Sequence, residues 1–94
     1  MTDDAKDGFD LIEYPTDFAF KAMCKAQEGS PAQDYIKGLV LPMLDDDALL
    51  GVSGNTSKTG KFESVTVRVR LQSREQLESI YKLIAASSRV VMTL

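Results

Sequence analysis

The chain has 94 residues, of which 44% are hydrophobic and 27% charged, and its formal net charge is −3. This length suits one domain with one hydrophobic core, and the composition is that of a globular protein rather than a disordered or fibrous one. The sequence has no histidine and a single cysteine, so Ser-His and Cys-His catalytic pairs, internal disulfides and typical zinc sites are excluded. No apolar stretch approaches the roughly 20 residues of a membrane span, and the first ten residues carry no apolar signal region. We therefore expect a cytoplasmic protein without a membrane partner.

The N-terminal part of the chain begins with an acidic segment and continues into a strand. We expect residues 1–10 to be a disordered acidic tail and residues 11–94 to form a single domain. Between positions 17 and 25 apolar residues alternate with others, which predicts a strand. Its apolar face is expected to hold Phe18, Phe20, Ala22 and Cys24.

A first helix is predicted to begin at Ser30. The segment Ser30-Pro31-Ala32-Gln33 has a capping serine, a first-turn proline and a glutamine three residues after the serine. Apolar residues then recur every three or four positions, and Pro42 is expected to kink or end the helix. This stripe is expected to face a sheet and contains Tyr35, Ile36, Leu39, Val40 and Met43.

The middle of the chain predicts a hairpin. After a polar break at residues 45–47, residues 48–55 suggest an edge strand, and residues 55–61 have no apolar residue and several turn formers. From Phe62 to Leu71 the alternation is the clearest in the sequence, so this strand should bury one face and expose the other.

The C-terminal part predicts a second helix and a closing strand. Ser73-Arg74-Glu75-Gln76 repeats the capping pattern, apolar residues follow at helical spacing to Ala85, and residues 89–94 are β-branched and apolar. The resulting order, βαββαβ, predicts an α+β fold of the ferredoxin-like class, a four-stranded antiparallel sheet with two helices on one face. The other face of the sheet should be open.

Several segments together resemble the YbeD-like family of small bacterial proteins of unknown function. They are Glu13–Phe18 with Lys21-Ala22-Met23, then Ser57–Val67, and then Ser73–Leu77, Ile80-Tyr81 and Arg89–Leu94. The resemblance implies a ferredoxin-like fold similar to ACT regulatory domains, a part in controlling lipoate metabolism, and no known catalytic residue. The chain departs from the family pattern at Cys24, where glycine is usual, and at Leu41–Asp47.

The candidate binding residues lie on the expected open face and on the hairpin beside it. A basic surface of this kind could receive an anion, an acidic partner or single-stranded nucleic acid, although a solvated face is the simpler interpretation. The candidates are Lys21, Ser57, Lys58, Gly60, Lys61, Phe62, Ser64, Arg68 and Arg70, with Lys25 on the same face.

This region matches neither a phosphate-binding loop nor an RNA-recognition sheet. The glycine-rich hairpin is no phosphate-binding loop, because its glycine spacing is wrong, Phe62 stands where Ser or Thr should bind magnesium, and a strand rather than a helix follows. An RNA-recognition sheet displays several stacking aromatics, whereas here Ser64 occupies the second stacking position. Nucleic-acid binding is therefore the weaker alternative.

Other candidate sites also have simple structural explanations. The turn at residues 28–30 with Gln33 is where ACT-like domains hold ligands, but Ser30 and Gln33 are explained by a capping box. Cys24 is expected to be a buried apolar residue rather than half of a metal site, and Asp45-Asp46-Asp47 a solvated turn. Acylphosphatase chemistry is disfavoured, since no arginine precedes Arg68.

These observations predict a non-catalytic regulatory or adaptor domain without metal or cofactor. It would bind a small ligand or a protein partner, and a homodimer is left open. The alternative is weak single-stranded nucleic-acid binding on the open sheet face.

Overall fold

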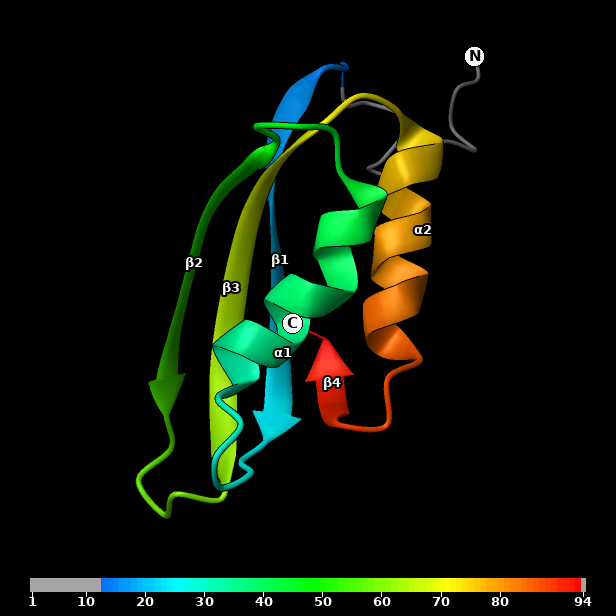
Figure 1. Ribbon diagram of the computed structural model, residues 1–94. Coiled ribbons are helices and arrows are strands. Elements are labelled where there is room, and N and C mark those ends of the chain that lie inside the picture. Colours follow the sequence, from blue (N-terminus) through cyan, green and yellow to red (C-terminus); the bar gives the residue numbers. More distant parts are fainter. Residues whose placement is uncertain (1–12, 94) are drawn as a thin grey trace.

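The computed structural model describes residues 13–93 and shows a four-stranded antiparallel sheet with two helices. The elements are β1 (Thr16–Lys25), α1 (Ala32–Val40), β2 (Leu49–Thr56), β3 (Phe62–Leu71), α2 (Arg74–Ala85) and β4 (Val90–Thr93), and a short 3₁₀ turn covers Leu41–Met43. The strand order across the sheet is β2-β3-β1-β4 (Figure 1). The predicted ferredoxin-like βαββαβ fold is confirmed. The expected acidic tail, residues 1–10, lies outside the described residues.

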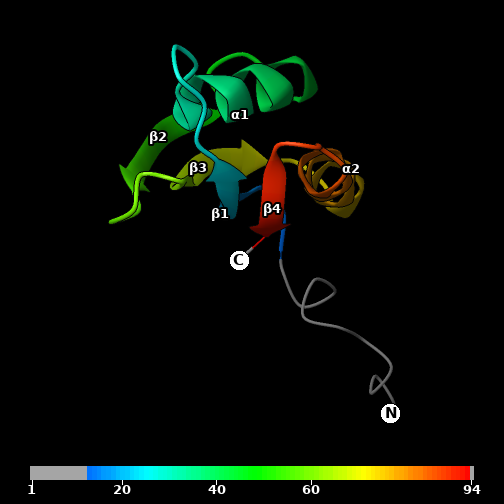
Figure 2. The same cartoon turned by 90° about the horizontal axis from the view of Figure 1, so that it is seen from below.

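The core lies between the helices and one face of the sheet. Strand β1 buries Phe20, Ala22 and Cys24 there, as the alternation predicted, and β3 buries alternate residues from Val65 to Leu71. Helix α1 packs over β3 and β2, whereas α2 lies beside β4 and also contacts β3 (Figures 1 and 2). Because strand side chains alternate between faces, the remaining strand residues point to the opposite side, which no helix of residues 13–93 covers.

The start of α1 differs from its prediction. The helix begins at Ala32, its N-cap is Pro31, and no side chain of the N-cap residue accepts a helical N–H. The Ala32 N–H instead donates to Glu63 Oε1 over 3.1 Å, from β3. The predicted serine cap at Ser30 is wrong, because Ser30 precedes the N-cap residue; its hydroxyl accepts a bond from Arg89 instead.

The other helix boundaries agree with the sequence. Helix α1 ends at Val40, and Pro42 lies in the 3₁₀ turn that follows. Ser73 caps α2 by accepting the Gln76 N–H over 3.1 Å. The Gln76 side-chain amide donates to the Met43 carbonyl over 3.0 Å, which ties the start of α2 to the 3₁₀ turn after α1. None of the helices within residues 13–93 is long and apolar enough to cross a membrane.

Candidate functional site

The uncovered face of the sheet carries most of the predicted binding residues. In register along β1 and β3, Lys21 lies opposite Thr66, Met23 opposite Ser64, and Lys25 opposite Phe62. Strands β1 and β3 pair along their whole lengths, which fixes these side chains in two parallel rows. The set therefore extends along a surface (hereafter the open face) and does not converge on a point.

The open face is basic. Arg70 and Asp17 face each other across β1 and β3, and their charged groups lie 3.1 Å apart. Asp17 is the one acid that the strands place on this face among the described residues. Lys21, Lys25 and Arg68 have no ion pair within the part of the chain that the structure describes. The face thus presents three uncompensated positive charges.

An apolar strip lies beside these charges. Met92 of β4 is 50% exposed and faces Met23 across the strand pair, and Phe62 is 36% exposed at the start of β3. Large apolar side chains grouped on a surface mark contact sites more often than singly scattered ones do. The open face therefore combines positive charge with apolar contact area.

The hairpin residues of the predicted set lie elsewhere. Ser57, Lys58, Gly60 and Lys61 form the turn between β2 and β3, at one end of the sheet (Figure 1). The Ser57 N–H donates to the Phe62 carbonyl over 2.8 Å and the Gly60 N–H donates to the Ser57 carbonyl over 3.0 Å, and Gly60 has a positive φ of 76°. These bonds account for the serine and the glycine as parts of a tight turn. The structure brings Lys21, Phe62, Ser64, Arg68 and Arg70 onto one face and leaves the hairpin at its rim.

A buried arginine that the sequence analysis did not single out links β4 to the start of α1. Arg89 is 7% exposed, and its Nε donates to the Lys25 carbonyl over 2.8 Å. Its two terminal nitrogens donate to Ser30, over 3.1 Å to Oγ and 2.6 Å to the carbonyl oxygen. Glu63 Oε2 lies 3.5 Å from the guanidinium, and Tyr35 places its ring 5.3 Å from the guanidinium carbon.

This group, called here the Arg89 cluster, is structural. All three nitrogens of the guanidinium donate to protein oxygen atoms, and Glu63 also holds the first helical N–H of α1. The Tyr35 hydroxyl bonds the Ser87 hydroxyl next to it. At the turn where ACT-like domains hold ligands, both Ser30 oxygens therefore accept bonds from Arg89 of the chain itself. The signal in the sequence was a lone arginine beginning an otherwise apolar strand.

Cys24 lies in the core and is unsuited to metal or nucleophilic chemistry. Its side chain is fully buried, and burial raises the pKa of the thiol; the nearby Arg89 charge opposes this rise and Glu63 adds to it. The thiol is therefore protonated near neutral pH, whereas a nucleophile or metal ligand must be the thiolate. No cluster of three metal-ligating side chains occurs within residues 13–93, and Asp45–Asp47 form part of a turn.

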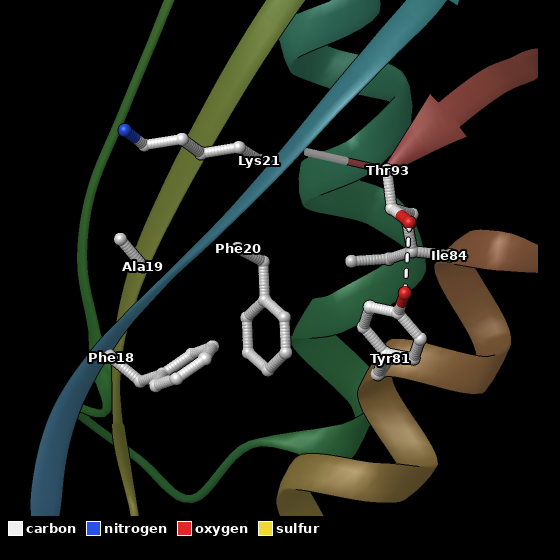
Figure 3. A pocket seen from close by; sticks show the side chains of 7 residues that line it. All are labelled: Phe18, Ala19, Phe20, Lys21, Tyr81, Ile84 and Thr93. Carbon is white, nitrogen blue, oxygen red and sulfur yellow. Dashed lines mark hydrogen bonds between the residues drawn. The ribbon is translucent and has the colours of Figure 1, made fainter. Parts of the chain in front are cut away.

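Four hollows have volumes between about 200 and 350 Å³, and the one of about 350 Å³ is open and lies beside Arg89 and Lys25. Two shallow ones flank Arg68 on the open face, with volumes of about 200 and 280 Å³. A more enclosed one of about 200 Å³ lies between the edge of β1 and α2 (Figure 3). It is lined by the rings of Phe18 and Phe20, with Tyr81 and Ile84 from α2 opposite.

Comparison with known proteins places the chain in a family. A family described as "Protein of unknown function (DUF493)" matches residues 10–94. The UPF0250 protein NE1487 of Nitrosomonas europaea is 35% identical over 85 residues, which cover 89% of this chain and 94% of that protein. The UPF0250 protein RSc0326 of Ralstonia nicotianae is 34% identical over 87 residues, covering 89% of this chain and 84% of that protein.

A solved structure supports the fold. The solution structure of protein HP0495 from H. pylori superposes with a TM-score of 0.69 and 22% sequence identity, covering 100% of this chain and 94% of that one. This likeness concerns the fold alone, and the names of the relatives state no activity, ligand or partner. The matches agree with the resemblance noted from the sequence, and the chain belongs to the DUF493 family of bacterial proteins of unknown function, the YbeD-like family.

Proposed function

We propose that the protein is a non-catalytic adaptor whose open face binds an acidic, partly apolar segment of a cytoplasmic protein partner. The observation that carries this proposal is the charge of the face: Lys21, Lys25 and Arg68 have no ion pair among the described residues, and the one acid there already bonds Arg70. A surface with this imbalance attracts negatively charged partners.

The shape of the face favours a protein segment over a small molecule. Small ligands are held in concave sites that cover most of their surface. The hollows on either side of Arg68 are shallow and open to solvent. The apolar strip of Met23, Met92 and Phe62 offers contact area of the kind that protein interfaces use.

The available side chains support binding rather than catalysis. The chain contains no histidine, and its only thiol is buried and protonated. The charged groups of the open face lie in extended rows, whereas an acid–base or nucleophilic site needs two groups within hydrogen-bond reach of one reacting atom.

Site-specific crosslinking in cells tests the proposal. A photo-crosslinking amino acid is placed at Thr66, in the middle of the open face, and in a second protein at Lys37, on the exposed side of α1. We expect one protein to be captured from Thr66 and not from Lys37, with the crosslinked peptide rich in Asp and Glu. Equal capture at both positions would contradict a specific open face.

Charge variants then connect capture to the basic side chains. Lys21→Ser with Arg68→Ser should abolish the Thr66 crosslink. Lys37→Ser with Lys82→Ser removes the same charge from the helices and should leave it unchanged. If the Thr66 crosslink goes to nucleic acid, the alternative of single-stranded binding replaces the proposal. A salt titration with an oligonucleotide checks this independently, because phosphate contacts weaken steeply with salt.

We extend the proposal to lipoate metabolism, the part that the family resemblance noted from the sequence implies. In a strain that lacks the gene, we expect the level of protein lipoylation to change and to return with the wild-type protein. The Lys21→Ser, Arg68→Ser variant should fail to restore it. An unchanged lipoylation level in the deletion strain would remove lipoate metabolism from the proposal and leave the binding role open to the crosslinking test.

A further inference from the structure

Strand β4 covers only part of its neighbour. Strand β1 runs from Thr16 to Lys25, and β4 pairs with it from Ala22 onward, as Figure 1 shows. Within residues 13–93, no strand pairs with the outer edge of β1 between Thr16 and Lys21. This stretch is called here the free edge of β1. Proteins usually cover, shorten or charge such edges, since unpaired backbone groups invite another strand.

The direction of the backbone groups along β1 follows from two hydrogen bonds. The Ala26 N–H donates to Lys61, on the β3 side, and the Lys25 N–H donates to Arg89, on the β4 side, each over 2.9 Å. Backbone groups of successive residues in an antiparallel strand alternate between the two edges. The N–H and C=O groups of Asp17, Ala19 and Lys21 therefore point outward from the free edge.

A cavity lies under this edge. Phe18 and Phe20 point to the helix side of the sheet with their ring centres 4.8 Å apart, and Tyr81 and Ile84 of α2 face them across about 200 Å³ (Figure 3). The Tyr81 hydroxyl bonds the Thr93 hydroxyl over 3.0 Å at one side. The Lys21 side chain points away from the cavity (Figure 3), so the cavity is apolar apart from this hydroxyl pair and backbone groups.

We propose that the free edge of β1 pairs with the same edge of a second copy of this chain, in an antiparallel arrangement centred on Ala19. The sequence of the edge is complementary to itself in this register. Asp17 lies opposite Lys21 of the partner subunit, and Lys21 lies opposite the partner's Asp17. Phe18 lies opposite the partner's Phe20. These are opposite-charge pairs on the open face and aromatic pairs on the helix side, both of which stabilise neighbouring strands.

This register also fits the backbone and the cavity. On the open face the register places three residues opposite their counterparts: Asp17, Ala19 and Lys21. Their N–H and C=O groups point outward, so the paired strands would exchange hydrogen bonds. The partner's Phe18 and Phe20 rings come to the helix side, where the cavity beside Tyr81 and Ile84 can receive them. The contact is isologous, so two copies close the assembly.

The dimer should be weak, because a short pair of strands buries less surface than a standard stable interface. We expect a dissociation constant between about 10 µM and 1 mM, the range of small, transient interfaces. Lys21 belongs to both the free edge and the open face, so the variants of Lys21 affect both proposals. The Ala19→Pro variant below changes no charge of the open face, so it distinguishes loss of the dimer from loss of partner capture.

Charge variants give a test that depends on the register. Sedimentation equilibrium of the full chain up to about 1 mM should show a concentration-dependent dimer. Asp17→Lys alone and Lys21→Asp alone should each weaken it by about tenfold or more, since each homodimer then has two like-charge pairs. An equimolar mixture of the two variants should regain it, because a mixed dimer has opposite charges at both positions.

A backbone variant tests the edge without changing charge. Ala19→Pro removes the Ala19 N–H, which points outward from the free edge and makes no hydrogen bond to β3. Proline is tolerated at a strand edge. This variant should keep its circular dichroism spectrum and lose the dimer. A wild-type protein that stays monomeric at about 1 mM would overturn the proposal. A dimer that survives Ala19→Pro, or a mixture that associates no better than the single variants, would overturn it as well.

Discussion

Replacing Arg89 with methionine removes the guanidinium from the Arg89 cluster and keeps an unbranched apolar side chain. The change deletes the bonds to the Lys25 carbonyl and to both oxygen atoms of Ser30. It also leaves Glu63, which is 19% exposed, without its cation. Glu63 holds the first N–H of α1, so the loss reaches the helix as well.

The loss of stability in Arg89→Met follows from the burial of the ion pair between Arg89 and Glu63. Removing one partner of a buried ion pair costs about 3–5 kcal/mol, because the remaining charge stays desolvated. The whole free energy of unfolding of a domain is about 5–15 kcal/mol. For a domain of 60–100 residues, each 1 kcal/mol lowers Tm by roughly 4–8 °C, so Arg89→Met should lower Tm by at least about 12 °C.

Urea denaturation followed by circular dichroism measures the change. Arg68→Met is the matched control, since Arg68 is exposed and has no ion pair among the described residues; it should alter the free energy of unfolding by no more than about 0.5 kcal/mol. Adding Glu63→Gln to Arg89→Met should recover about 1–3 kcal/mol, because the stranded charge is gone. A loss below about 1 kcal/mol for Arg89→Met would refute the reasoning.

Three further outcomes are expected. The pKa of the Cys24 thiol is raised in the folded state, so this thiol contributes fully to stability below the ordinary thiol pKa of 9.0. The contribution is lost as the pH rises above that value. Above it, the urea midpoint of the wild type should therefore fall more than that of Cys24→Ala. Ser73→Ala should cost about 1 kcal/mol in the same assay by removing the α2 cap, and an unchanged midpoint would contradict the capping role. Gly54→Ala would place a Cβ 2.5 Å from the Ser64 carbonyl oxygen, so we expect a loss of about 1–3 kcal/mol, and a neutral result would mean that β2 can shift away.

Local patterns in the sequence determined the elements and their order. The alternation from Phe62 to Leu71 and the spacing of apolar residues in both helices depend on neighbours a few positions away, and the structure confirms these segments. The second capping motif was also readable, because Ser73 and Gln76 lie within one helical turn. The open face could be predicted from the same alternation, since a strand side chain opposite a buried one must point to the other side.

Only the tertiary structure decided which polar groups meet across the chain. Glu63 caps α1 from 31 positions away, and Arg89 takes the hydroxyl of Ser30 that the local motif had assigned to the helix. No periodicity encodes such contacts, because they depend on how two distant elements are placed by the core. The length of β4 is a similar case: the sequence predicted a closing strand, and only the pairing showed that it leaves the edge of β1 free before Ala22. The sequence therefore determined which face of the sheet is open, and the packing decided which charges remain unpaired on that face.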